Sequence, residues 1–137
     1  MTINYLVTHS GGFHADELLS SAVLTCLFPE ADLLRSRDQL CITPAVDKII
    51  YDVGGDYDIE AQIFDHHQSP SPLRDDGQPF SSFGLIWKHY GRAYLGSFDV
   101  LSQNIDLIHA KLDANFVLPI DLVDNGTIEP SVAGPVS

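Results

Sequence analysis

The sequence predicts an α/β fold, with a parallel, doubly wound sheet flanked by helices. Short apolar segments rich in β-branched residues alternate along the chain with longer segments of helical periodicity, and glycine, proline and polar residues separate them. The 137 residues, 45% of them hydrophobic, suit one domain with a substantial core. We expect this domain to cover residues 1–126 and an irregular tail to cover residues 127–137.

Strands are predicted at four short segments rich in apolar residues. These segments are residues 3–8, 31–36, 48–53 and 61–65. The first runs into a loop with two glycines, the third ends at Gly54-Gly55, and the fourth stops at His66-His67. The carboxyl ends of such strands meet at one edge of a parallel sheet, where ligands bind.

Helical periodicity predicts the elements between and after these strands. A helix from about Asp16 to Leu27 is followed by Pro29, and a short helix over residues 38–45 is limited by Pro44. After a proline-rich loop over residues 69–79, Ser81 or Ser82 caps a helix through Tyr90 that Gly91 ends.

The last part of the chain carries one more amphipathic segment. A helix is expected from Phe98 to about Leu112. Residues 116–123 are apolar and suggest a strand near Val117, followed by the turn Asp124-Asn125-Gly126.

The charge balance disfavours two classes of partner. Acidic residues outnumber basic ones by 19 to 7, for a formal net charge of −12, and the basic residues are scattered. Nucleic-acid binders usually neutralise phosphates with clustered lysine and arginine, so we expect no grip on duplex DNA and no binding to an anionic membrane. An acidic protein can still meet a phosphate if metal cations stand between them.

Other composition signals are plain. Cys26 and Cys41 lie in apolar surroundings without metal-like spacing, which predicts buried, reduced thiols. We see no leader-peptide pattern and no apolar run long enough for a membrane span. The expected location is therefore the cytoplasm.

Histidine and aspartate gather at the predicted strand ends. They are His9 after the first strand, His14 and Asp16 where the next helix begins, Asp52, the run Asp65-His66-His67, and Asp124. This mixture suits Mn²⁺, Zn²⁺, Fe²⁺ or Co²⁺. The number of groups exceeds the needs of one ion and fits two ions that share a carboxylate.

Each of these residues has a simpler reading when taken alone. A single aspartate at a strand end is usually a turn residue, and a single loop histidine is usually solvated. Their recurrence on one side of the sheet favours a site. His89 and His109 lie within helices and are not assigned to it, and Ser10-Gly11-Gly12 reads as a tight turn near a ligand rather than as a serine nucleophile.

The motifs that hold these residues also resemble a known family. They are residues 8–17 (THSGGFHADE), 51–55 (YDVGG), 64–68 (FDHHQ), 80–87 (FSSFGLIW) and 124–126 (DNG). In order and spacing they resemble the melanocyte-proliferating-gene family, also labelled metal-dependent protein hydrolase, a branch of the DHH phosphoesterase superfamily. The resemblance covers about residues 3–126 and implies 3′–5′ RNA exonuclease activity.

The resemblance also implies roles for individual residues around a pair of Mn²⁺ or Mg²⁺ ions. His9 and His14 would bind the first ion and Asp52 would bridge the two. The second ion would be bound by Asp16, His66 and Asp124. Asp65 would support the histidines that follow it, and His67 would face the phosphate.

Two departures from the superfamily pattern stand out. An aspartate is usual where His14 stands, and the spacing from His9 is one residue longer here, which could shift the metal preference away from Mg²⁺. Family members are usually longer and carry a second domain, which is not expected in this chain after the motif at residues 124–126. A homo-oligomer or a partner chain could supply it.

The sequence therefore predicts a phosphoester hydrolase that uses divalent metal, most readily Mn²⁺. Catalysis would involve Asp52, His66 and His67. The expected substrate is an RNA end or a short oligonucleotide, hydrolysed by a water that two metals activate. A small phosphoanhydride is an alternative substrate, and a metal- or nucleotide-binding module without turnover is an alternative function.

Overall fold

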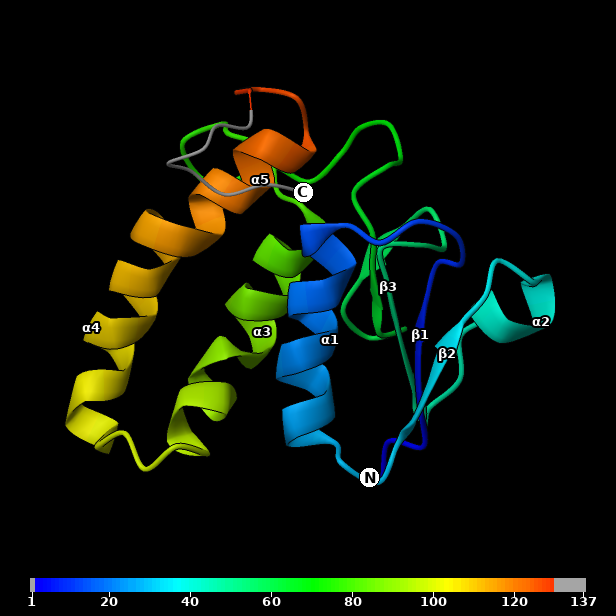
Figure 1. Cartoon of the computed structure of the whole chain (residues 1–137), viewed down its shortest axis with the longest axis horizontal. Helices are drawn as coiled ribbons and strands as arrows, with labels where there is room; N and C mark the ends of the chain where they lie inside the picture. The colour runs from blue at the N-terminus through cyan, green and yellow to red at the C-terminus, as the bar shows by residue number, and fades with distance from the viewer. Residues whose placement is uncertain (1, 130–137) are drawn as a thin grey trace.

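The computed structural model describes residues 2–129 and shows a mostly parallel sheet with helices packed against it (Figure 1). Its strands are β1 (Tyr5–Thr8), β2 (Asp32–Arg35), β3 (Lys48–Tyr51), β4 (Tyr57–Asp58) and β5 (Ile63–Phe64). Their order is β2-β1-β3-β5-β4, and only the edge strand β4 is antiparallel to its neighbour. The predicted α/β class is confirmed.

The helices cover the two faces of the sheet unequally. They are α1 (Ala15–Leu27), α2 (Gln39–Ile42), α3 (Ser82–Gly96), α4 (Ser102–Leu112), the π-helical segment η1 (Asp113–Val117) and α5 (Leu118–Asp124). Helices α1 and α3 pack side by side on one face, with α4 outside them, whereas the short α2 lies on the opposite side (Figure 1).

The core follows this division. The larger cluster lies between the sheet and α1 and α3, and includes Leu6, Ile49 and Phe64 from the strands with Leu24 and Leu85 from the helices. The opposite face of the same strands forms a smaller cluster. It contains Val7, Ile50, Val53 and Ile63, with Cys41 and Ile42 of α2 packed against them. Strand side chains alternate between the two faces, so both clusters come from the same short segments.

The chain reverses its direction of travel across the sheet at β1. It passes from β1 through α1 to β2 on one side, and then through α2 to β3 on the other side of β1. The loops that leave β1 and β3 therefore diverge at the carboxyl ends of these strands. Such a switch point is where open α/β sheets form their ligand crevice.

Two predicted boundaries in the helical region are wrong. Helix α3 does not end at Gly91 but continues to Gly96, and α4 begins at Ser102 rather than Phe98. Gly91 serves close packing instead of termination, because a Cβ there would lie 2.7 Å from the Trp87 ring and 2.9 Å from the His109 ring.

The apolar segment over residues 116–123 is helical, so the strand suggested near Val117 is also wrong. The chain continues from α4 through η1 into α5, where Pro119 lies at the first turn and its missing N–H costs no helical hydrogen bond. Its apolar residues face the core between α1 and α3, with Val117 and Ile120 nearly inaccessible.

Both cysteines are free thiols, but the prediction that both are buried is wrong. Cys26 is exposed in the last turn of α1 and Cys41, within α2, is half-buried. Of the predicted tail, residues 127–129 form no helix or strand and residues 130–137 lie outside the described residues. Among residues 2–129, no helix has the length and apolarity to span a membrane.

Candidate metal centre

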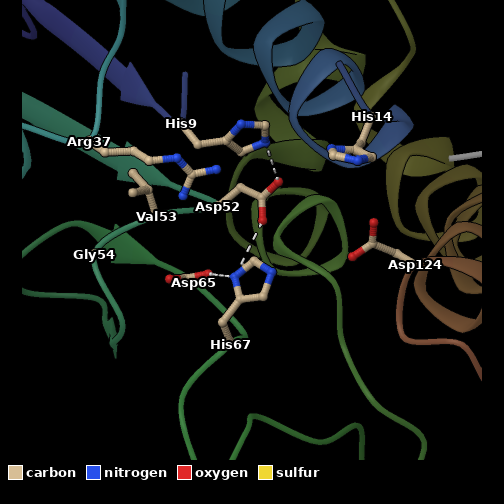
Figure 2. Close-up of a pocket in the computed structure, with 9 residues that line it drawn as sticks. All are labelled: His9, His14, Arg37, Asp52, Val53, Gly54, Asp65, His67 and Asp124. Atoms are coloured by element: carbon tan, nitrogen blue, oxygen red, sulfur yellow. Dashed lines mark hydrogen bonds and ion pairs between the residues drawn. The ribbon is translucent and has the colours of Figure 1, made fainter. Parts of the chain in front are cut away.

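A cavity of about 510 Å³ opens at the carboxyl ends of β1, β3 and β5 (Figure 2). It is lined by His9, His14, Arg37, Asp52, Val53, Gly54, Asp65, His67 and Asp124. The two remaining predicted site residues, Asp16 and His66, are buried directly behind the lining and contact Asp52 and Asp124. The structure thus brings all eight predicted residues to one place.

The first group of donors surrounds the loop after β1. His9 donates its Nδ1–H to the Ser10 carbonyl at 3.1 Å, which leaves Nε2 facing Asp52 Oδ2 at 3.3 Å. His14 precedes α1, and its backbone N–H is bound by both carboxylate oxygens of Glu17 at 2.9 and 3.0 Å. Ring and carboxylate atoms of His9, His14 and Glu17 come within 4.8 Å of one another, so they could hold an ion.

Asp52 stands between the two halves of the cavity. It follows β3 directly in a left-handed backbone conformation, with φ of 57°, which aspartate tolerates better than most residues. One carboxylate oxygen faces His9, and the other lies 3.4 Å from His66 Nε2 and 3.7 Å from His67 Nδ1. This position is the one that a bridging carboxylate would need.

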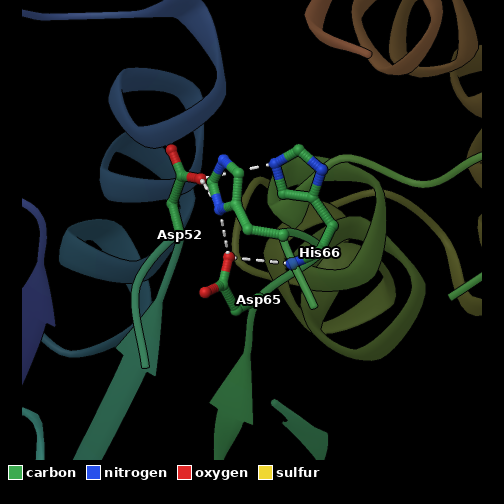
Figure 3. Close-up of side chains that lie close together, drawn as sticks. Asp52, Asp65 and His66 are labelled. Atoms are coloured by element: carbon green, nitrogen blue, oxygen red, sulfur yellow. Dashed lines mark hydrogen bonds and ion pairs between the residues drawn. The ribbon is translucent and has the colours of Figure 1, made fainter. Parts of the chain in front are cut away.

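Asp65 anchors the histidines that follow β5 (Figure 3). Its carboxylate accepts the N–H of Gly55 at 2.8 Å, the backbone N–H of His66 at 2.8 Å and the Nδ1–H of His67 at 2.7 Å. Burial alone would raise the pKa of Asp65, but the hydrogen bonds from His67 and Gly55 lower it below its usual value. The same bond to Asp65 raises the pKa of the His67 ring.

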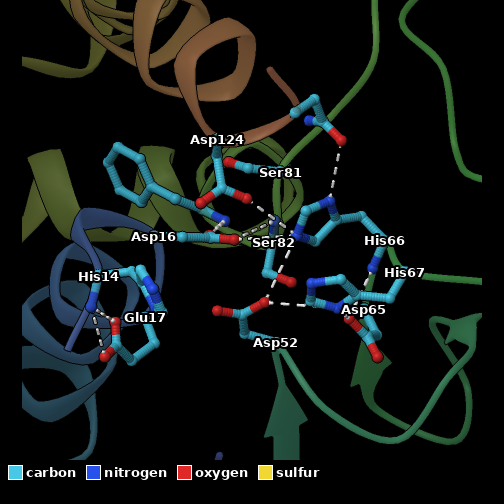
Figure 4. Close-up of polar contacts among 12 residues, drawn as sticks. His14, Asp16, Glu17, Asp52, Asp65, His66, His67, Ser81, Ser82 and Asp124 are labelled. Carbon is cyan, nitrogen blue, oxygen red and sulfur yellow. Dashed lines mark hydrogen bonds and ion pairs between the residues drawn. The ribbon is translucent and has the colours of Figure 1, made fainter. Parts of the chain in front are cut away.

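The second group of donors meets at His66 Nε2 (Figure 4). This atom lies 3.1 Å from Asp16 Oδ2, 3.1 Å from Asp124 Oδ2 and 3.4 Å from Asp52 Oδ1. Burial alone would lower the pKa of His66, but its contacts with Asp124, Asp16 and Asp52 raise it to about 12. Three carboxylates therefore favour a positive charge at this point, which a metal cation could supply in place of the proton.

Asp16 is held from behind by helix α3. Its carboxylate accepts the backbone N–H of Phe83 at 2.6 Å and that of Ser82 at 3.3 Å, at the positive end of the helix dipole. The side chain is completely buried, and this burial raises the pKa of Asp16 to about 8. The backbone donors fix the orientation of the carboxylate and leave Oδ2 near His66.

The donor set fits divalent metal. Each of His9, His66 and His67 donates its Nδ1–H to an oxygen, the usual arrangement behind a metal-binding imidazole, and so presents Nε2. Within residues 2–129, the buried atoms Asp52 Oδ1 and His66 Nε2 have no hydrogen-bond partner. Buried polar atoms are rarely left unsatisfied, and a cation between them would satisfy both.

Three contributors escaped the sequence analysis. Glu17 was not assigned to the site, yet it is buried beside His9. Asn125 accepts the His66 Nδ1–H at 3.2 Å, although its motif was recognised only as a turn. Arg37 lines the cavity two residues after β2. Its position after a predicted strand, at the same edge of the sheet, could have indicated that it belongs to the site.

The residues that were set apart do lie elsewhere. His109 stacks on Trp87 and donates to its carbonyl oxygen, and His89 contacts the Tyr57 hydroxyl. Neither lines the cavity. In the loop after β1, Gly11 has φ of 94°, which agrees with the tight turn predicted there.

Fold and cavity together define an α/β protein that gathers histidine and carboxylate donors at the switch point of its sheet. The chain belongs to the MYG1 exonuclease family, described as an uncharacterised protein family (UPF0160), whose model matches residues 5–133. This is the family that its motifs resemble.

Curated relatives are similar over most of this chain. Identity is 37% to the MYG1 protein of Dictyostelium discoideum, 36% to the MYG1 exonuclease of Mus musculus and 39% to MYG1 protein C694.04c of Schizosaccharomyces pombe. These alignments cover 87–88% of this chain but only 34–39% of the relatives, so the chain spans about a third of their length. No solved structure matches it.

Proposed function

We propose that this protein is a metal-dependent phosphoester hydrolase that removes nucleotides from the 3′ end of RNA or short oligonucleotides. The observation that carries the proposal is the buried centre of the donor set, where His66 Nε2 lies within 3.4 Å of carboxylate oxygens of Asp16, Asp52 and Asp124. The name exonuclease, given to the mouse, bovine and human relatives, supports a nuclease.

The donors divide into two metal sites that share Asp52. His9 and His14 would hold one ion, with Glu17 beside them. The other ion would be held by the cluster of Asp16, His66 and Asp124. Imidazole with carboxylate favours Mn²⁺ over Mg²⁺. A relationship to the DHH phosphoesterases, which the motifs suggest, would account for such a shared pair of sites.

The metals, when bound, would supply an activated water and neutralise charge on the phosphate. Asp65 holds His67 by its Nδ1, so that Nε2 is free to serve the substrate. The raised pKa of His67 favours the protonated ring, which would give its Nε2 proton to the leaving oxygen as the phosphorus–oxygen bond breaks. Arg37 would contact a phosphate oxygen from the β2 side of the cavity.

The expected substrate has few phosphates. Among the described residues, Arg37 is the only lysine or arginine that lines the cavity, and the whole chain has a net charge of −12. A long phosphate backbone would meet repulsion beyond the metal centre. A terminal phosphodiester needs only a few cationic contacts, and the metal ions and Arg37 would supply them within the cavity.

The test uses the Mn²⁺-loaded protein with a 3′-labelled RNA oligonucleotide, a dinucleotide and pyrophosphate. We expect mononucleotide release from RNA, loss of this release in Asp52→Asn, and no loss in the control Asp99→Asn, which changes an exposed aspartate on the loop before α4. Equal release by wild type and Asp52→Asn would refute the proposal. Cleavage of pyrophosphate alone would reassign the substrate to a small phosphoanhydride.

The length comparison favours one second candidate, a metal- or nucleotide-binding module that turns over substrate only with further chain or a partner. The relatives are about three times as long as this chain, which covers 34–39% of them. This candidate predicts tight Mn²⁺ binding in a calorimetric titration without hydrolysis of any of the three substrates. Hydrolysis by the chain alone would exclude it.

A further inference from the structure

A buried ion pair lies behind the metal cluster, outside the cavity. Asp121 in α5 is completely buried, and one of its oxygens accepts the Nε–H of Arg74 at 2.9 Å and an Nη2–H at 2.6 Å. The other oxygen accepts the backbone N–H of Ser81 at 3.0 Å and its hydroxyl at 2.6 Å. Neither Arg74 nor Asp121 lines the cavity.

Arg74 joins this carboxylate to a second part of the helical run. Its guanidinium also donates to Asp113 of η1 at 2.7 and 3.0 Å. Arg74 lies in the loop between the histidines after β5 and helix α3. The network therefore ties that loop to α3, η1 and α5.

One branch of this network reaches Asp16. Ser81 precedes α3, and its hydroxyl both donates to Asp121 and accepts the Gly84 N–H at 3.3 Å. The next two backbone N–H groups, of Ser82 and Phe83, are those that hold the Asp16 carboxylate. A shift of the α3 start would therefore move Asp16.

The other branch reaches His66 and Asp124 through α5. The carbonyl oxygen of Asp121 accepts the side-chain N–H of Asn125 at 2.9 Å, and Asn125 in turn accepts the His66 Nδ1–H. Asp124 belongs to the same helix as Asp121, one turn later. All three members of the second donor cluster thus depend on elements that Asp121 joins.

The Asp121 carboxylate occupies space that is open because residue 84 is glycine. A Cβ at Gly84 would lie 2.5 and 2.6 Å from the two carboxylate oxygens of Asp121, whereas a Cβ at Gly96 in the same helix would be 3.8 Å from its nearest neighbour. The Phe-Gly pair of the motif at residues 80–87 therefore has a spatial reason: Phe83 binds Asp16, and Gly84 admits Asp121.

We propose that the Arg74–Asp121 ion pair is a positioning device for the metal site formed by Asp16, His66 and Asp124. The inference rests on the proposed function, because it assumes that this cluster binds metal. Arg74 and Asp121 act through Ser81 and Asn125 and touch neither metal nor substrate. Partners behind metal ligands typically change metal affinity by about tenfold to a hundredfold when they are altered.

Two variants perturb the Arg74–Asp121 ion pair without removing a proposed metal ligand. Gly84→Ala pushes on the Asp121 carboxylate, with Gly96→Ala as the matched control in the same helix. Arg74→Lys keeps the charge but loses the planar set of donors that serves Asp121 and Asp113 together. Its matched control is Arg92→Lys, which alters the exposed ion pair between Arg92 and Asp106.

The experiment is a calorimetric Mn²⁺ titration of each purified, folded variant, with folding checked by circular dichroism. We expect two binding steps in wild type and a loss of about tenfold to a hundredfold in one step for Gly84→Ala and Arg74→Lys. Asp124→Asn, which removes a ligand, identifies that step as the second site. The two controls should match wild type.

Three results overturn the inference. Wild-type affinity in both steps for folded Arg74→Lys would do so while leaving the proposed function intact, and it decides the matter if Gly84→Ala does not fold. An equal loss in both steps would show general loosening rather than positioning. Absence of Mn²⁺ binding by wild type would remove the proposed function and the inference together.

Discussion

Asp65 is buried directly after β5, and two of its hydrogen bonds hold the two histidines that follow it, while a third binds Gly55. The backbone bond to His66 fixes the direction of the chain, and the side-chain bond to His67 selects which ring nitrogen stays free. A single carboxylate thus determines which atoms the cavity presents. The sequence resemblance implied a supporting role for Asp65, and its contacts agree with that role.

Arg37 offers a prediction at the level of one side chain. Its guanidinium lines the cavity, is exposed and makes one long hydrogen bond, to the Ser10 carbonyl at 3.4 Å. Arg37→Ala should raise KM for an oligonucleotide substrate by roughly tenfold, the weight of one charge-assisted hydrogen bond of about 1.5 kcal/mol. Steady-state kinetics at fixed Mn²⁺ would measure it, with little change in Mn²⁺ affinity.

The control for this substitution is Arg92→Ala, since Arg92 is also exposed but pairs with Asp106 on the helical side. We expect its KM to equal that of wild type. A KM unchanged in Arg37→Ala, or raised equally in both variants, would show that Arg37 does not contact the substrate.

Helix α3 continues past a glycine that by itself predicts a helix end. Gly91 is a strong terminator in isolation, yet the helix continues for five residues beyond it to Gly96. The absence of a side chain lets His109 of α4 and the Trp87 ring approach the helix, and these two rings stack with centroids 5.0 Å apart. Close packing of α4 on α3 therefore explains the glycine.

Gly91→Ala tests this explanation. The added methyl group would meet Trp87 at 2.7 Å and His109 at 2.9 Å. Overpacking of this kind costs about 1–3 kcal/mol, against a gain of up to about 1 kcal/mol from better helix propensity, so the free energy of unfolding should fall. Urea denaturation followed by Trp87 fluorescence would measure the change.

Gly96→Ala is again the comparison, because the nearest atom to its Cβ is 3.8 Å away, an ordinary contact. Its stability should equal or exceed that of wild type. If Gly91→Ala proves as stable as Gly96→Ala, the glycine is not required by packing.

The helical run from Ser102 to Asp124 is the other element that local pattern misread. Its π-helical turn over Asp113–Val117 changes the helix phase between α4 and α5. This places Asp113 against Arg74 and brings Asp124 to the cavity at the other end. An apolar stretch with a proline resembles a strand unless these long-range contacts are known.

At the scale of the whole molecule, a small group of carboxylates is buried at one centre. Asp16, Asp52 and Asp65 are each at most 4% exposed, and all lie within one site. Buried carboxylates this close repel one another unless positive charge lies between them. We therefore expect the stability of the folded chain to depend strongly on a cation bound between these carboxylates.

This dependence predicts a metal effect on stability. At about a hundredfold excess over its dissociation constant, each bound Mn²⁺ ion should stabilise the folded chain by about 2.7 kcal/mol. For a domain of this size, such a gain raises Tm by roughly 10 °C. Thermal unfolding with Mn²⁺ and with EDTA would measure the shift, which should shrink in Asp52→Asn. Equal shifts in wild type and that variant would place the bound ion elsewhere.

The sequence by itself predicted the α/β class, four of the five strands that the structure describes and a group of site residues at one edge of the sheet, although it missed the two-residue strand β4. It could do so because strand and helix periodicity are local, and because parallel strands must deliver their carboxyl ends to one edge. His9, Asp52 and the Asp65-His66-His67 run needed no further information to be placed together.

Only the tertiary structure decided what surrounds these residues. The links from Asp121 to Arg74 and Ser81 span 47 and 40 residues, and Asn125 meets His66 across 59. Such contacts depend on how helices pack, which no local period encodes. For the same reason Gly91 lies inside a helix and residues 116–123 are helical, since packing energy there outweighs the local preference of a few residues.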